Sequence, residues 1–161
     1  MLEVPFHHQN TRYSCGPASL KMVLEFFGVH VDERKIAKIA HTNKDGTKHK
    51  YLISTARIEG FYCYIHDNST LHEIFHFISI GLPVIVHIVE PTSGEGHYSV
   101  VVGFSRKGVI LNDPWNGKRF VMGYDKFIEN WHSGKGGHLF RKWIMVISNR
   151  KFSVGKEYLP K

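Results

Sequence analysis

Cysteine is scarce in this chain, and what is missing excludes several classes of protein. Two cysteines in 161 residues, Cys15 and Cys63, can form at most one bridge, which excludes a disulfide framework. The longest apolar runs, PVIVHIV and SVVVGF, are far too short to cross a bilayer, so we expect no integral membrane segment. Internal repeats, low-complexity tracts and interdomain linkers are also missing. We therefore predict a single domain over residues 1–161.

The first residues and the charge balance limit the location and the partners. The opening MLEVPFHH lacks the basic and apolar regions of a signal peptide, so we expect a cytoplasmic protein, unless a leader or fused domains have been removed. The net charge is +7, but the 21 Lys and Arg residues are scattered and accompany no nucleic-acid-binding motif. We therefore expect no nucleic-acid partner. An anionic surface remains a candidate contact for the basic surface, and the oligomeric state is open.

Hydrophobic periodicity predicts helices mainly in the first half of the chain and strands in the second. Apolar residues at helical spacing, with glycines and caps at the ends, predict helices over residues 15–27, 31–40, 50–60, 68–81 and 124–131. Short runs rich in β-branched and aromatic residues predict strands over residues 61–66, 82–90, 97–104, 108–113, 118–123 and 140–148. This pattern indicates an α+β fold, with a helical N-terminal half packed on an antiparallel β-sheet in the C-terminal half.

Cys15 lies at the predicted start of the first helix, where a thiol is readily activated. The apolar spacing of residues 20–27 forms a helix that Gly28 ends, and Pro17 suits its first turn. Free N–H groups and the positive end of a helix dipole favour an anion, and so raise the thiolate fraction of a cysteine placed there. Cys63 stands among apolar residues in FYCYIH and is interpreted as a buried structural cysteine. Position alone leaves Cys15 open as reactive or inert.

A cysteine nucleophile needs a base and a group that orients the base. His97 opens the run HYSVVVGF behind a glycine-containing loop, and Asp113 ends the next strand in LNDP. Taken singly, they are as easily a loop histidine and a turn aspartate. Two antiparallel strands joined by a short turn can nevertheless bring an imidazole and a carboxylate together at their open ends. With Cys15, they would form a nucleophile triad.

Strand parity sets a condition on this triad. Side chains alternate between the faces of a sheet, so a two-residue turn at Arg106 and Lys107 with regular pairing would put Asp113 on the wrong face. We therefore predict an odd-length connection or a bulge in this hairpin. We also predict that the Asp113 carboxylate lies within hydrogen-bond distance of His97 Nδ1.

The stretches QNTRYSCGPASL, GHYSVVVG and LNDP resemble the papain-like cysteine peptidases that process bacteriocin leaders after a Gly-Gly pair, and the resemblance covers nearly the whole chain. By this resemblance, Cys15 matches the nucleophile and His97 the base. Asp113 matches the orienting acid, and Gln9 matches the glutamine that donates to the oxyanion. A peptide or protein substrate and no cofactor are implied. The best-known members are fused to a membrane transporter with an ATPase, whereas this chain resembles the free-standing branch. For that branch leader specificity does not carry over automatically, so a Gly-Gly-type leader peptide is one candidate substrate and a separate transporter one candidate partner. Ser14 stands where we associate an acidic residue with leader-processing members.

Two other interpretations stay open. Residues 72–76, HEIFH, match the H-E-x-x-H signature, in which His72 and His76 would bind Zn²⁺ and Glu73 would be the general base of a zinc metallopeptidase. The apolar residues of this helix take the core face and leave all three toward solvent, and no third histidine follows at metzincin spacing, so we predict no metal site. A catalytically inactive peptide-binding module is the other alternative. Other acyl transfers could also use the residues proposed for peptide hydrolysis.

Overall fold

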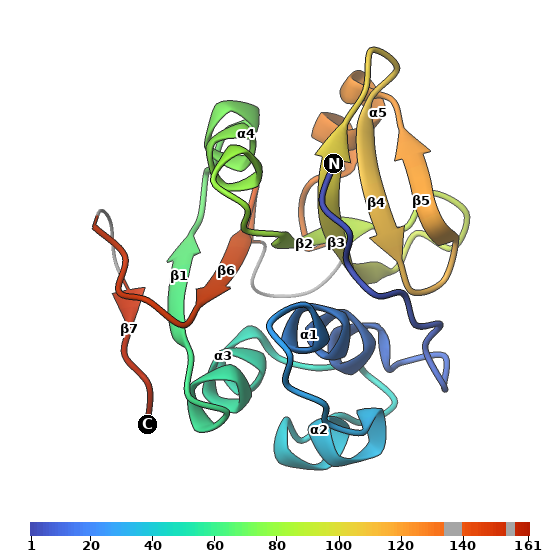
Figure 1. The fold of residues 1–161 in the computed structure, drawn as a ribbon. Helices are drawn as coiled ribbons and strands as arrows, with labels where there is room; N and C mark the ends of the chain where they lie inside the picture. The colour runs from blue at the N-terminus through green and yellow to red at the C-terminus, as the bar shows by residue number, and fades with distance from the viewer. Residues whose placement is uncertain (134–139, 154–156) are drawn as a thin grey trace.

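Within the described residues, 1–133, 140–153 and 157–161, the chain forms a seven-stranded antiparallel sheet with helices on both faces (Figure 1). The fold class is therefore α+β, as predicted. The helices are α1 (Cys15–Phe26), α2 (Glu33–Ile39), α3 (His49–Ile58), α4 (Leu71–Ser79) and α5 (Tyr124–Asn130). The strands are β1 (Tyr62–His66), β2 (Val84–Val89), β3 (Gly96–Phe104), β4 (Val109–Asp113), β5 (Gly117–Met122), β6 (Ile144–Ser148) and β7 (Glu157–Tyr158).

The order of the strands mixes the two halves of the chain. The sheet runs β5-β4-β3-β2-β6-β1-β7, so β1 from the first half lies between β6 and β7. The strand predicted at residues 61–66 is thus β1, a paired strand of the same sheet. β7 was not predicted, since two residues are too few for a periodic pattern.

Side-chain alternation along the strands separates two apolar layers. On β6, Met145 and Ile147 point to the layer that includes α1, α2 and α3, whereas Ile144 and Val146 point to the layer that includes α4 and α5. Figure 1 shows the first three helices grouped on one side of the sheet and α4 well apart from them. Helices thus cover both faces of the sheet.

Helix α1 packs against β3, and this packing carries Cys15 to the sheet. Leu20, Met22 and Leu24 are fully buried, and the helix ends where Gly28 adopts a positive φ of 82°. The helix begins at Cys15, close to the start of β3. Among the described residues, no helix is both long enough and apolar enough to cross a membrane.

Candidate active site

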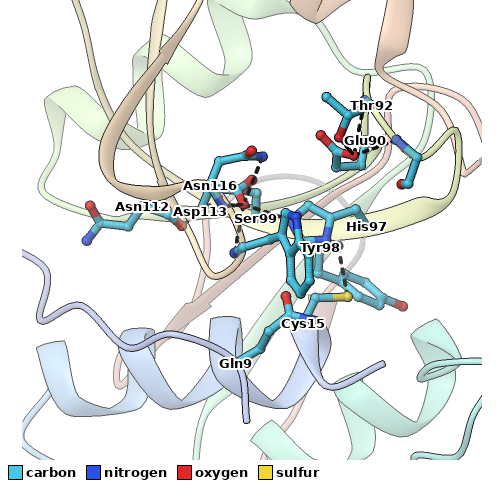
Figure 2. A network of polar contacts seen from close by, with 12 residues as sticks. Gln9, Cys15, Glu90, Thr92, His97, Tyr98, Ser99, Asn112, Asp113 and Asn116 are labelled. Atoms are coloured by element: carbon cyan, nitrogen blue, oxygen red, sulfur yellow. Dashed lines mark hydrogen bonds and ion pairs between the residues drawn. The ribbon is translucent and has the colours of Figure 1, made fainter. Parts of the chain in front are cut away.

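The structure brings the start of α1 against the start of β3. Cys15 is 8% exposed, and its Sγ accepts a hydrogen bond from the backbone N–H of Tyr98 at 3.4 Å. Figure 2 shows the sulfur beside His97, with Gln9 next to Cys15. Both cysteines are free, and Cys63 is fully buried in β1, as predicted. Burial raises the pKa of the Cys63 thiol to about 12, which makes it inert at neutral pH.

His97 and Asp113 form a buried ion pair beside Cys15. The His97 Nε2 and Asp113 Oδ1 atoms are 2.9 Å apart, and the carboxylate is fully buried. The same oxygen accepts the backbone N–H groups of Trp115 and Asn116 at 2.9 and 2.8 Å. Asp113 is therefore fixed by the turn that follows it as well as by the imidazole.

The predicted ring nitrogen was wrong. The carboxylate meets Nε2 of His97, whereas Nδ1 was expected. The reason is the direction from which each partner approaches. Asp113 on the neighbouring strand reaches Nε2, the ring nitrogen farther from the His97 backbone, while the Cys15 sulfur lies against the β3 backbone at Tyr98. Nδ1 is thus the nitrogen left for Cys15.

These contacts keep a proton on His97. Burial alone would lower the pKa of the imidazole, but hydrogen bonds to Asp113 and Cys15, with the negative charge of both, raise it to about 10. Burial would likewise raise the pKa of the Asp113 carboxyl, but His97 and the N–H groups of Asn116 and Trp115 hold it below its ordinary value. At neutral pH the pair is therefore an imidazolium and a carboxylate.

A bulge puts His97 and Asp113 on one face of the sheet. The β3–β4 connection is the two-residue turn at Arg106 and Lys107, and a hydrogen bond from Ser105 N–H to the Gly108 carbonyl closes it. The prediction of an odd-length loop is therefore wrong. The bulge that was the other possibility is present. Val101 pairs with Leu111 and Gly103 with Ile110, which leaves Val102 as the extra residue.

The bulge also anchors the chain that leads to Gln9. The Val102 carbonyl accepts the backbone N–H of Leu2 at 2.7 Å. Further along, the side-chain amide of Asn112 donates to the Val4 carbonyl at 2.9 Å. The backbone N–H of Gln9 then donates to the carbonyl of Pro114, directly after Asp113. One hairpin thus positions the acid, the base and the approach to the glutamine.

Gln9 is half-buried beside Cys15, and its side chain is held by its own loop. Its Nε2 donates to the Thr11 carbonyl at 2.8 Å. An amide nitrogen has two hydrogens, so one N–H remains for another acceptor. The structure therefore brings together all four residues that the sequence singled out.

The glycine after Cys15 is tightly packed. A Cβ on Gly16 would lie 3.1 Å from the Thr47 side chain and 3.2 Å from the Tyr98 ring. The Tyr98 hydroxyl in turn donates to the Thr47 carbonyl at 2.7 Å. Thr47 and Tyr98 thus form the wall beside the nucleophile. Sequence reasoning missed both, because neither residue type marks a site.

Sequence reasoning also missed a pair of histidines beside the site. His49 Nε2 and His87 Nδ1 are 2.6 Å apart, and the His87 ring stacks on Tyr98 with centroids 4.4 Å apart. Burial lowers the pKa of His49 to about 4, and burial with the nearby histidines lowers that of His87 to about 3. Both rings are therefore neutral at physiological pH. With twelve histidines in the chain, no local signal distinguishes these two.

The HEIFH motif lies in α4, and its glutamate is already engaged. Glu73 accepts hydrogen bonds from the Tyr64 hydroxyl, the Ser69 hydroxyl and His66 Nδ1, at 2.6 to 2.7 Å. His72 and His76 are exposed on the helix surface. In the part of the chain that the structure describes, no three metal-ligating side chains are grouped to hold a metal ion. The zinc alternative therefore gains no support from the geometry.

Comparison with known proteins shows the family of this chain. Residues 3–135 match the Peptidase C39 family. The chain belongs to this family. An uncharacterised protein of Methanothermobacter marburgensis is 32% identical over 111 residues, 68% of this chain and 71% of that protein. The transport/processing ATP-binding protein ComA of Streptococcus pneumoniae is 28% identical over 131 residues, which are 78% of this chain and only 17% of ComA. Membership of the family supports a cysteine peptidase.

Solved structures share the fold. The peptidase domain of Streptococcus ComA superposes with a TM-score of 0.76 at 22% identity, covering 92% of this chain and 100% of that domain. A putative C39-like peptidase from Bacillus anthracis gives 0.75 at 17% identity, over 93% and 96% of the two chains. A double glycine motif protease from an AMS/PCAT transporter, solved with its leader peptide, gives 0.70 at 21% identity, over 90% and 91%.

Proposed function

We propose that this protein is a cysteine peptidase in which Cys15 is the nucleophile, His97 the base and Asp113 the orienting acid. The observation that carries the proposal is the buried His97–Asp113 ion pair, with the Cys15 sulfur held beside it at the start of α1. In this proposal the proton of the Cys15 thiol passes to His97 Nδ1, and the resulting thiolate is the reactive form of cysteine.

The first half of the reaction forms an acyl-enzyme. The Cys15 thiolate attacks the carbonyl carbon of the peptide bond, a C–S bond forms, and the electron pair of the carbonyl moves to oxygen. The oxyanion would accept hydrogen bonds from the remaining N–H of Gln9 and from the backbone N–H of Cys15, which starts a helix and has no intrahelical acceptor. The C–N bond then breaks, and His97 Nδ1 gives its proton to the leaving amine.

The second half returns the enzyme to its starting state. Water attacks the thioester carbon and gives a proton to His97, the C–S bond breaks, and the carboxylic product leaves the thiolate behind. Asp113 holds the imidazole through Nε2 during both steps, so that Nδ1 stays directed at the sulfur.

We propose a peptide with a double-glycine leader as the substrate. Support comes from the C39 family and from two similar proteins, the transport/processing ATP-binding protein ComA and a double glycine motif protease solved with its leader peptide. We propose a transporter as the partner, because the relative ComA is named a transport/processing ATP-binding protein.

A peptide-library cleavage assay tests the proposal. Wild-type protein should cleave after a Gly-Gly pair, Cys15→Ala should abolish cleavage while keeping the fold, and the matched control Cys63→Ala should remain active. Replacing the second glycine of the substrate by valine should stop cleavage. Binding of peptides without cleavage by wild-type protein would instead favour the inactive peptide-binding module. Cleavage that survives Cys15→Ala would overturn the assignment of the nucleophile.

A further inference from the structure

The loop that carries Gln9, residues 9–14, is closed by its own hydrogen bonds. The backbone N–H of Thr11 donates to the Ser14 hydroxyl oxygen at 2.9 Å, and the Gln9 side chain donates to the Thr11 carbonyl. We call these residues the Gln9 loop. Its internal bonds set the shape of the loop, but they do not set where the loop lies relative to Cys15.

Two contacts from outside the loop fix its place. The backbone N–H of Gln9 donates to the Pro114 carbonyl at 3.0 Å. The next N–H along the chain, that of Asn10, donates to the carboxylate Oε2 of Glu33 at 2.9 Å. Glu33 is the first residue of α2, so this contact ties the loop to the layer of helices that carries Cys15.

Glu33 is an unfavourable residue for stability at its position. Its side chain is buried, with 4% of the residue exposed. Burial raises the pKa of the Glu33 carboxyl, and hydrogen bonding to the Asn10 N–H and the Ser14 hydroxyl only partly offsets this effect. Replacing a buried charged group by a well-packed apolar one is often neutral or stabilising. A carboxylate in the first turn of α2 gains some stability from the helix dipole, but burial opposes it, so stability alone is a weak reason for Glu33 at this position.

We propose that Glu33 is a positioning residue, which holds the Gln9 loop through Asn10 so that the Gln9 amide faces the oxyanion. This inference rests on the proposed peptidase function. Glu33 acts through the backbone and touches no reacting atom. Its loss should therefore weaken stabilisation of the transition state while leaving formation of the thiolate by His97 intact.

Three variants separate this role from a merely structural one. Glu33→Met removes the acceptor but keeps the volume, Glu33→Gln keeps an acceptor oxygen, and Asp32→Asn is the exposed neighbour that serves as control. We expect kcat on a Gly-Gly peptide to fall about tenfold in Glu33→Met, with KM within about twofold, and to stay within about threefold of wild type in the other two. The melting temperature of Glu33→Met should equal or exceed that of wild type.

Alkylation of Cys15 by iodoacetamide provides the second measurement. Its rate should be the same in all four proteins, because it reports the thiolate and not the oxyanion donors. A kcat of Glu33→Met within twofold of wild type, or an alkylation rate that falls in parallel with kcat, overturns the proposal.

Amide hydrogen exchange tests the contact even if the proposed peptidase function fails. The Asn10 amide should exchange at least about tenfold faster in Glu33→Met than in wild type, with Glu33→Gln in between. Unchanged exchange at Asn10 would show that Glu33 does not hold the loop. If wild-type protein cleaves no peptide but this exchange difference is present, the peptidase proposal alone is at fault.

Discussion

At the scale of single residues, the two cysteines have opposite chemical environments. Cys15 lies beside a protonated imidazole, whereas burial raises the pKa of Cys63 to about 12. Since the thiolate is the reactive form, iodoacetamide at pH 7 should modify Cys15 on the order of a hundredfold faster than Cys63. Mass spectrometry of the digested protein measures both rates. Equal rates in the folded protein would contradict the assignment of Cys15 as the nucleophile.

The Asp113 carboxylate raises the pKa of His97 first through its hydrogen bond and then through its negative charge. Asp113→Asn keeps the size of the side chain and an acceptor for the following N–H groups, so the fold should persist. Loss of the negative charge should lower the pKa of His97 from about 10. We expect kcat to fall by at least about tenfold and its basic limb to move to lower pH. A pH profile of hydrolysis measures this, with Asp125→Asn as an exposed control, and an unmoved basic limb would argue against the triad.

Sequence reasoning could predict only some residues of the site. Cys15, His97 and Asp113 stand at ends of strongly patterned elements, where side-chain type and place together suggest chemistry. Thr47 and Glu33 act through contacts with residues that are distant along the chain. Such contacts exist only once the layers are packed, so no local pattern predicts them.

At the scale of elements, the residue just before β4, Gly108, lies very close to the backbone at the end of β5. A Cβ on Gly108 would lie 2.0 Å from the Met122 carbonyl oxygen, whereas a Cβ on Gly123 would meet only Lys107 O, at 3.8 Å. Gly108→Ala should therefore destabilise the fold by about 3 kcal/mol or more, because a backbone atom cannot easily move aside. Gly123→Ala should change stability by less than about 1 kcal/mol. Urea unfolding measures both, and similar values for the two variants would contradict this packing.

Helix α4 shows how a motif can match a signature and serve another purpose. Glu73 links α4 to β1 through the Tyr64 hydroxyl, and Thr70 caps the helix by accepting the Glu73 N–H. We therefore expect EDTA, or the double change His72→Ala with His76→Ala, to leave hydrolysis within about twofold of wild type. Loss of activity on chelation that Zn²⁺ restores would favour the zinc metallopeptidase.

The elements themselves were largely predictable. All five helices and six of the seven strands of the described chain follow from apolar periodicity and from glycine or capping signals, with ends shifted by a few residues. The bulge was predictable as a condition of the triad. Its position at Val102 was not, because it depends on packing and on the Leu2 contact from the far end of the chain.

At the scale of the whole molecule, the groups with shifted pKa values make the stability of the fold depend on pH. His97, with its pKa raised from 6.5 to about 10, adds stability that is complete below pH 6.5 and lost as the pH rises through 10. The lowered pKa values of Asp113 and Glu73 add stability above their ordinary values of 3.8 and 4.5, which is lost as the pH falls below these values. The raised pKa of Glu33 works in the opposite sense, since its contribution is lost as the pH rises above 4.5.

The buried neutral His49 and His87, whose pKa values are lowered to about 4 and about 3, add stability that is lost as the pH falls below 6.5. The midpoint of urea unfolding should therefore be highest near about pH 6.5 to 7 and should fall toward both about pH 4 and about pH 10. In His97→Ala the fall on the alkaline side should be smaller, because the group that loses its proton is gone. Equal alkaline losses in the two proteins would show that another group governs stability there.

The extra residue at Val102 also limits how sequences of this family can change in length. With a two-residue turn, His97 and Asp113 share a face only because one residue of β3 is bulged. A relative whose histidine and aspartate are one position closer in sequence should therefore have a regular ladder here. Single-residue insertions and deletions in this hairpin should therefore occur together with gain or loss of the bulge. Relatives without the bulge should hold the segment before their glutamine by a contact other than the Leu2–Val102 hydrogen bond.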